Sequence, residues 1–276
     1  SGGHSGTDIN TERACANKVV SRFLYNWYET CPETALAEIK GGNLRNAIAR
    51  EANAVIGVPA SAKEALSVAI NNYEADLRIE YKRTEPTFEV SIESVDTPAN
   101  VIDADTARRV VYALYSAPHG VTYYSKEIEG LVETSTNLGA IKMPGNNTIV
   151  VSTLQRSSVE SRKEDIVGQV VAHFKLAGAS VYSDEGYQGW APNMDSHILQ
   201  VAVDVHEKLF GSKPVVNAIH AGLECGLFLA KYPHLDMISF GPTLRNVHSP
   251  QEMMHIPAVA KYWDLIRGII NAVAGK

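Results

Sequence analysis

Histidines in glycine-containing loops are the first residues of this sequence that could do chemistry. His4 lies in the run Gly2-Gly3-His4-Ser5-Gly6, and His248 lies in a later loop, 241–250. An imidazole held in a loop can present one ring nitrogen to a metal or a substrate, and neighbouring glycines let a ligand approach the backbone closely. The alternatives are a flexible tip at His4 and, at His248, a histidine that only bonds its own loop.

Three further residues have side chains or amides suited to holding a polar ligand. Asn46 ends a strand-like run, where its amide could orient a carbonyl group. Arg156 follows a predicted strand, and its planar guanidinium suits a carboxylate. Gly222 precedes a predicted helix, so its backbone amide could face an anion. Taken singly, each residue has an ordinary structural alternative, such as a strand asparagine or a surface arginine.

The sequence contains no complete zinc site. A tetrahedral site needs three or four nitrogen, oxygen or sulfur ligands. There is no His-Glu-x-x-His or Cys-x-x-Cys motif, and the histidines are widely scattered. His234-Leu235-Asp236 has the spacing of a ligand pair but precedes a predicted strand, at the end away from the expected site. Cys225 is interpreted as a small buried hydrophobe, because no base lies at a useful spacing.

Composition narrows the class of protein. The chain has 276 residues, 45% of them hydrophobic, and a formal charge of −6. This charge argues against nucleic acid or an acidic membrane surface as the main partner, and no apolar run approaches the roughly 18 residues of a membrane span. Three cysteines are too few for a disulfide framework and favour a reducing, cytoplasmic setting. The glycine-rich start without methionine suggests a piece of a longer protein.

The first two thirds of the chain alternate helical and strand patterns. Apolar residues at helical spacing predict helices over 13–28, from a capping box at Ser61 to Glu64, from Asp103, and over 160–176. Alternation predicts strands over 87–95, 134–142 and 148–155, the last two joined by a turn at Pro144 to Asn147. These elements predict an α+β region over residues 1–182.

The remaining residues, 183–276, predict a smaller α/β region. Helices are expected over 196–209, over 223–231 and from Pro257 onward. Between them lie two continuously apolar runs, 214–219 and 235–240, of the kind found in buried parallel strands. The overall fold class is therefore α/β, with residues 183–276 as its second region.

Several ordered motifs resemble the second half of the bacterial aminoacyl-histidine dipeptidases, also called Xaa-His or cytosol non-specific dipeptidases, a branch of the di-zinc peptidase superfamily. The resemblance extends over nearly the whole chain, and its motifs are Gly2 to Ile9, Asn46 to Ala52, Leu131 to Gly139, Arg156-Ser157-Ser158, His220 to Gly226, and Met237 to Pro250. It implies a lid or dimerisation domain over 1–182, followed by the C-terminal portion of a zinc-binding catalytic domain over 183–276.

The resemblance also implies roles for the candidate residues. His248 would be the last zinc ligand, and His4 the lid histidine that stabilises the tetrahedral intermediate. Asn46 and Arg156 would grip the substrate, Arg156 at its carboxylate, and Gly222 would offer a backbone contact beside the metals.

By this resemblance, the parent protein is a cytoplasmic, homodimeric dipeptidase that uses two zinc ions to activate water against Xaa-His and other dipeptides. The other zinc ligands and the catalytic acids are expected in a preceding segment that the sequence does not contain, so the isolated chain is predicted to be inactive. Because its strands lack neighbours, region 183–276 is predicted to be less ordered or more aggregation-prone than the lid, or to find a substitute partner in a dimer. The alternative function is a non-catalytic dimerisation or ligand-binding module.

Overall fold

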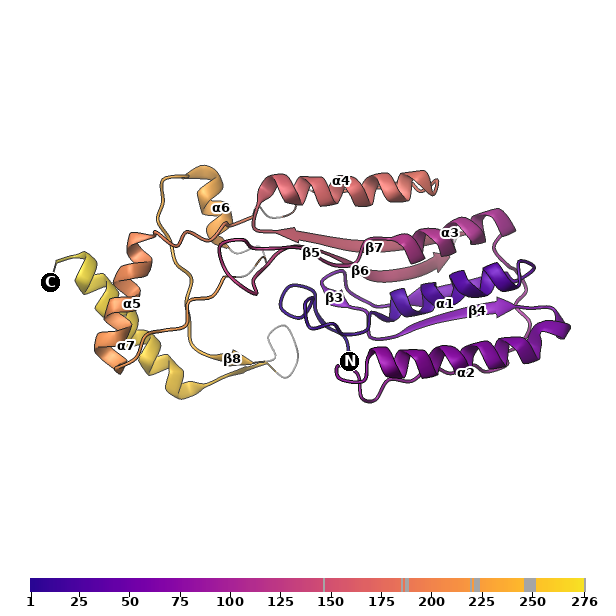
Figure 1. The fold of residues 1–276 in the computed structure, drawn as a ribbon. Coiled ribbons are helices and arrows are strands. Elements are labelled where there is room, and N and C mark those ends of the chain that lie inside the picture. Colours follow the sequence, from indigo (N-terminus) through magenta and orange to yellow (C-terminus); the bar gives the residue numbers. More distant parts are fainter. Residues whose placement is uncertain are drawn as a thin grey trace. The chain divides into compact units, whose positions relative to one another are not determined.

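The computed structural model describes residues 1–145, 147–184, 186, 189–218, 220, 224–245 and 252–275. The contacts within the chain divide it into two compact units. Unit 1 comprises Ser1–Gly186 with Ile219–Ala221, and unit 2 comprises Tyr187–Ala218 with Gly222–Lys276. Both units mix helices and strands (Figure 1), which confirms the α/β class.

Unit 1 is built on a five-stranded antiparallel sheet. The long strand β6 is central, and β7 pairs along one of its edges. On the other edge of β6, β5 pairs with the first part of the strand and β2 with the later part. Strand β4 pairs with β2 and forms the outer edge. The strands are β2 (Ala35–Gly41), β4 (Ala52–Gly57), β5 (Gly120–Tyr124), β6 (Val132–Gly145) and β7 (Thr148–Ser157).

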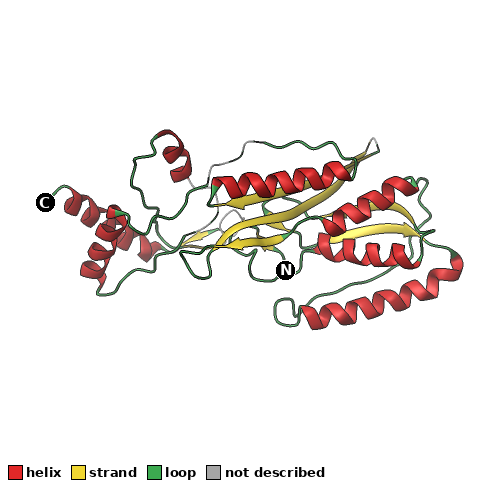
Figure 2. Ribbon diagram, turned by 45° about the horizontal axis from the view of Figure 1, so that its top comes forward, coloured by secondary structure: helices red, strands yellow, loops and turns green. Residues whose placement is uncertain are grey.

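Three helices share one core with this sheet (Figure 2): α1 (Ala16–Thr30), α3 (Ala104–Ser116) and α4 (Glu160–Leu176). The buried side chains of this core include Leu24 of α1, Leu114 of α3 and Val170 of α4. The sheet contributes Leu36 of β2 and Leu138 of β6. The fourth helix, α2 (Lys63–Glu80), packs outside α1 through a stripe at helical spacing made of Leu66, Ile70, Tyr73 and Leu77. A small pair of strands, β1 (Gly3–His4) and β3 (Ala47–Ile48), completes the unit.

Most predicted elements of unit 1 are confirmed. Helix α4 has the predicted bounds, and β6 and β7 form the predicted hairpin. Asp103 caps α3 by accepting a hydrogen bond from the amide of Thr106 at 3.0 Å. The predicted capping box at Ser61 was wrong. Ser61 lies inside a 3₁₀ helix, η1 (Ala60–Ala62), that precedes α2. The N-cap of α2 is therefore Ala62, which makes no side-chain hydrogen bond.

The predicted strand over 87–95 was also wrong, since these residues join no sheet. Phe88 and Val90 instead pack against the residues of α1 and α2, while Ile92 is exposed. The alternating apolar residues thus reflect partial burial of Phe88 and Val90 against the helices, and not pairing in a sheet. Strand β5 was missed, although Val121 to Tyr124 are all residues with strand preference.

Unit 2 contains the expected helices, α5 (His197–Phe210), α6 (Glu224–Lys231) and α7 (Ile256–Val273). Ser196 caps α5 by accepting from the amide of Leu199 at 3.1 Å, and Gly211 ends the helix in the left-handed conformation. Pro257 lies in the first turn of α7, as predicted. Gly268 of α7 lets this helix approach Val205 of α5 closely.

The parallel sheet predicted for this region is absent from the residues that the structure describes. Residues 214–218 and 235–240 are irregular, and the sheet present is the antiparallel pair β8 (Leu244–Arg245) and β9 (Met253–Met254). Apolar strands form only where neighbours satisfy their backbone groups, and the described residues of this region provide no strand that pairs with either run. Within the described part of unit 2, Ile269 is the one apolar side chain that is fully buried. In the same described ranges, every helix is too short or too polar to cross a bilayer.

Candidate functional site

The alternation of strand β6 creates a polar face opposite the helices of unit 1. Leu138 points into the core shared with the helices, so its neighbour Asn137 and, two residues earlier, Ser135 point to the opposite face. Ser135 is the register partner of Arg156 on β7, which places Arg156 on that face too. Both Ser135 and Asn137 are fully buried. This face therefore carries buried polar groups, and a small apolar cluster that includes Ile48 and Val132 packs against Val121, the strand partner of Ser135.

The hydrogen bonds of His4 define which ring nitrogen carries its proton. His4 pairs with Ala47 across β1 and β3, and its own amide donates to Oδ2 of Asp8 at 2.8 Å. Its Nδ1 accepts from the amides of Gly6 and Thr7 at 3.2 and 3.3 Å. A nitrogen that accepts has no proton, so the neutral ring is protonated at Nε2. The imidazole of His4 is thus set to donate from Nε2.

Arg156 lies beside His4. A Cβ added to Gly6 would lie 3.0 Å from Cε1 of His4 and 3.6 Å from Cζ of Arg156, so Gly6 is in contact with both side chains. Nε of Arg156 donates to Oγ of Ser5 at 3.4 Å. No carboxylate of the described chain lies within ion-pair distance of Arg156, and burial lowers the pKa of its guanidinium. The result is a partly buried cation without a counter-ion among these residues.

A third basic residue, His220, joins this cluster. Its Nε2 lies 2.8 Å from Oγ of Ser135, and the residue is 4% exposed. Burial is the main reason that the pKa of His220 is lowered to about 4, and the neighbouring Arg156 and His4 contribute smaller parts of that shift. His220 is therefore a neutral imidazole at pH 7. It belongs to unit 1 by its contacts, although it follows the first segment of unit 2 in sequence.

Asn46 lies in the turn before β3, next to the strand that carries His4. Its carbonyl accepts from the amide of Ser5 at 2.9 Å, which ties this turn to the His4 segment. The turn packs directly on the backbone of β6: a Cβ added to Gly139 would lie 2.7 Å from Cα of Arg45. Backbone contacts thus bring Asn46, His4 and Arg156 to the same part of unit 1.

This arrangement is suited to an anion. The Nε2–H of His4, the guanidinium of Arg156 and the amide of Asn46 are hydrogen-bond donors, and the guanidinium carries a positive charge. Donors in a partly buried setting stabilise a carboxylate or a developing oxyanion. Among the described residues there is no group of three His, Cys, Asp or Glu side chains that could hold a metal ion.

The predicted site residues divide into two sets. His4, Asn46 and Arg156 are brought together, whereas Gly222 and His248 lie outside the described residues. The motif His220 to Gly226 was identified, but the His220 side chain was given no role, because the serine that it contacts is 85 residues earlier in the sequence. Asp236 interacts with the start of α5, where its carboxylate accepts a hydrogen bond from the amide of Ile198. Hydrogen bonds from Ser196 and, to a smaller extent, from Ile198 lower the pKa of this carboxyl.

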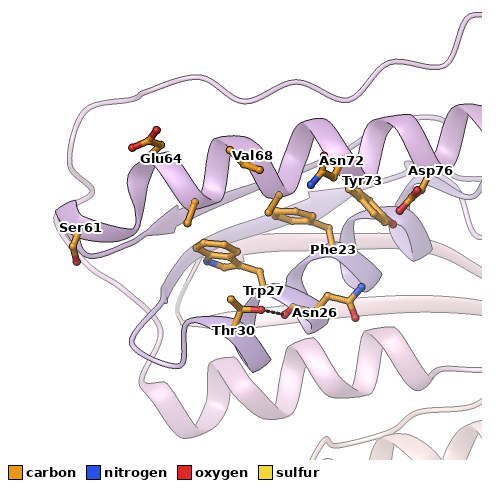
Figure 3. A pocket seen from close by; sticks show the side chains of 12 residues that line it. Phe23, Asn26, Trp27, Thr30, Ser61, Glu64, Val68, Asn72, Tyr73 and Asp76 are labelled. Atoms are coloured by element: carbon orange, nitrogen blue, oxygen red, sulfur yellow. Dashed lines mark hydrogen bonds between the residues drawn. The ribbon is translucent and has the colours of Figure 1, made fainter.

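A separate groove of about 720 Å³ lies between α1 and α2 (Figure 3). Phe23, Trp27 and Tyr73 form its apolar floor, and none of the predicted site residues lines it. The groove is therefore distinct from the cluster at His4.

The first 85 residues match the family model described as the peptidase dimerisation domain. Over 275 residues, the chain is 36% identical to the cytosol non-specific dipeptidase of Escherichia coli (strain K12), with 100% of this chain and 56% of that protein covered. The crystal structure of aminoacylhistidine dipeptidase from Vibrio alginolyticus superposes with a TM-score of 0.89 at 40% identity, covering 99% of this chain and 55% of that one.

The chain thus spans about half the length of the proteins it matches. Both matches extend over 99% or more of this chain, and so include the segments that carry His4, Asn46 and Arg156. Over almost all of its length, the chain is therefore homologous to about half of each of these two dipeptidases.

Proposed function

We propose that this chain is the lid and the C-terminal catalytic portion of a zinc-dependent dipeptidase, and that its lid binds the carboxylate of the dipeptide. The observation that carries this proposal is the partly buried Arg156, which has no carboxylate partner in the described chain. A dipeptide always ends in a carboxylate close to its scissile bond. A planar guanidinium that lacks a counter-ion suits that group.

The neighbouring residues then have complementary roles. His220 is neutral and adds no positive charge beside Arg156. The guanidinium of Arg156 is therefore the main group that would attract the carboxylate of the dipeptide. We propose that the Asn46 amide orients a substrate carbonyl. The Nε2–H of His4 is a donor for the oxyanion that forms when that carbonyl is attacked. These roles need the donors to face the scissile bond in the whole protein.

Zinc would be held mainly by residues that the 276-residue sequence does not contain. From this chain we propose His248 as one ligand, since an imidazole nitrogen is a common zinc ligand, and we propose the Gly222 backbone as a contact beside the metals. The described residues include no group of three ligands, so by themselves they do not form a zinc site. The isolated chain is accordingly expected to be inactive, with the parent protein carrying the two-zinc centre.

We propose residues 1–182 as the lid and dimerisation domain and 183–276 as the C-terminal portion of the catalytic domain. The match to a peptidase dimerisation domain over 1–85 includes the edge strand β4 and helix α2. An edge strand has unpaired backbone groups that a second copy can satisfy, which supports a homodimer through unit 1. Segments 214–218 and 235–240 of unit 2 are apolar but irregular. This supports the proposal that they pair with further strands in the whole protein.

A cytoplasmic location is proposed on two grounds. The Escherichia coli relative is named a cytosol dipeptidase, and all three cysteines of this chain are free thiols.

The test is hydrolysis of a Xaa-His dipeptide by the full-length parent with zinc and by the 276-residue chain. Activity in the parent but not in the shorter chain is expected. The alternative, a non-catalytic dimerisation or ligand-binding module, predicts no hydrolysis by either protein. Dipeptide hydrolysis by the 276-residue chain alone would show that the proposed division of the zinc ligands is wrong.

A further inference from the structure

We infer that Asn137 is a positioning residue that fixes Asn46 for substrate. This inference rests on the proposed function in one respect, namely that Asn46 contacts the dipeptide. The geometry concerns a single side-chain amide and the turn of residues 42–48, which we call the Asn46 turn. No sequence motif assigned a role to Asn137 itself.

Both N–H groups of Asn137 are used on the Asn46 turn. Nδ2 donates to the carbonyl of Arg45 at 2.9 Å and to that of Ala47 at 2.8 Å, the residues on either side of Asn46. The carbonyl of Asn46 itself accepts from the amide of Ser5. Three consecutive carbonyls are therefore held, and the backbone dihedral angles that direct the Asn46 side chain have little freedom.

The amide of Asn137 has one orientation compatible with these contacts. If it were flipped, its oxygen would face two carbonyl oxygens and both hydrogen bonds would be lost. In the orientation present, Oδ1 is buried and has no hydrogen-bond partner in the described chain. Buried polar atoms without partners are uncommon and cost stability. Asn137 thus makes two hydrogen bonds to the Asn46 turn while its own Oδ1 has no partner in the described chain. This arrangement supports a role in positioning the turn.

The same turn extends this effect to His4. Ala47, whose carbonyl Asn137 holds, is the strand partner of His4. Loss of the Asn137 amide is thus expected to loosen Asn46 first and the His4 segment second. A purely structural role would instead lower the stability of the sheet without a specific effect on substrate.

The experiment is a double-mutant cycle in the full-length parent, with KM and kcat for a Xaa-His dipeptide as readouts. Asn137→Asp keeps the shape and removes the donors, and Asn137→Ala removes the whole amide. Each is expected to raise KM about tenfold, the size of a lost hydrogen bond that leaves part-buried carbonyls unpaired. In an Asn46→Ala background, the same changes should raise KM no further, because the group they position is gone.

Tyr73→Phe is the matched control. It removes one buried hydrogen bond from a side chain to a carbonyl, Tyr73 to Val19, away from the Asn46 turn. It should lower stability and leave KM unchanged. Asn137 variants with wild-type KM, or with effects that add fully to Asn46→Ala, would overturn the inference.

Hydrogen exchange in the 276-residue chain separates this inference from the proposed function. The amide of Ser5, which donates to Asn46, should exchange at least about tenfold faster in Asn137→Asp than in Tyr73→Phe. If the parent proves inactive, the proposed function fails, while faster exchange at Ser5 still supports the role of Asn137. Unchanged exchange at Ser5 in the folded variant would contradict it.

Discussion

Oγ of Ser135 lies 2.8 Å from Nε2 of His220, although 85 residues separate the two in the sequence. Ser135 is also the strand partner of Arg156. One serine on β6 thus places an imidazole and a guanidinium on the same buried face. Burial, and to a smaller extent the charge of the guanidinium beside it, hold this imidazole in its neutral form.

This neutral imidazole makes stability depend on pH. The pKa of His220 is about 4 in the folded chain, against 6.5 for an ordinary histidine. The unfolded chain therefore binds the proton first as the pH falls, so the stability contribution is present above pH 6.5 and is lost toward pH 4. The difference corresponds to about 3 kcal/mol for this buried group.

Urea unfolding between pH 7 and pH 4 is the measurement. The free energy of unfolding of His220→Gln is expected to fall less steeply with acid than that of the wild type. His119, whose pKa is also lowered to about 4 by burial and by Lys18, should show the same behaviour in His119→Gln. Equal pH slopes in the wild type and both variants would contradict this account.

Gly139 is predicted to be intolerant of any side chain. An added Cβ would lie 2.7 Å from Cα and 2.8 Å from the carbonyl oxygen of Arg45, and backbone atoms cannot swing away as a side chain can. Gly139→Ala should therefore lower the free energy of unfolding by about 1–3 kcal/mol.

The matched control is Gly168→Ala in α4, where an added Cβ meets nothing within 4 Å. Since alanine favours the helix, this variant should raise stability by about 0.5–1 kcal/mol. Chemical denaturation compares the two variants. A Gly139→Ala protein as stable as the wild type would show that the Asn46 turn does not pack tightly on β6.

Arg156→Lys is predicted to weaken dipeptide hydrolysis by the parent protein. Lysine keeps the charge but loses the planar fork that binds both oxygens of a carboxylate, so kcat/KM should fall by about tenfold or more. A dipeptide amide, which lacks the carboxylate, should be hydrolysed equally by the wild type and the variant. Arg78→Lys, on the far helix α2 and paired with Glu74, is the control and should change neither rate. Equal losses on the acid and the amide would argue against a role at the carboxylate.

The parts of the fold that local sequence determines were predictable. Helix α4 and the β6–β7 hairpin follow from helical spacing and from the Pro144-Gly145 turn, which involve neighbouring residues only. His4 and Arg156 were found as candidates by residue type and position. Their proximity could not be predicted, because it depends on Gly6 fitting between the two side chains in the folded chain.

Other features depend on contacts that are distant in sequence. The helical stripe of α2 was visible, but whether Ser61 caps that helix depends on the turn before it. Asn137 looks like any strand residue until the Asn46 turn is seen over it. The runs 214–219 and 235–240 have the apolar character of buried strands, yet strand formation requires a neighbour that local sequence cannot supply.

Hydrogen exchange is predicted to differ sharply between the two units of the 276-residue chain. Amides of residues 215–218 and 235–240 join no ladder, and exposed apolar side chains such as Val215 and Trp263 leave unit 2 with little buried area to stabilise it. These amides should exchange near the rate of an unfolded chain, while those of β6 and β7 should be protected up to the global free energy of unfolding. In the full-length parent, the same unit 2 amides should become protected, because the remaining strands would pair with them. Equal protection of both units in the short chain would mean that unit 2 is complete without a neighbour.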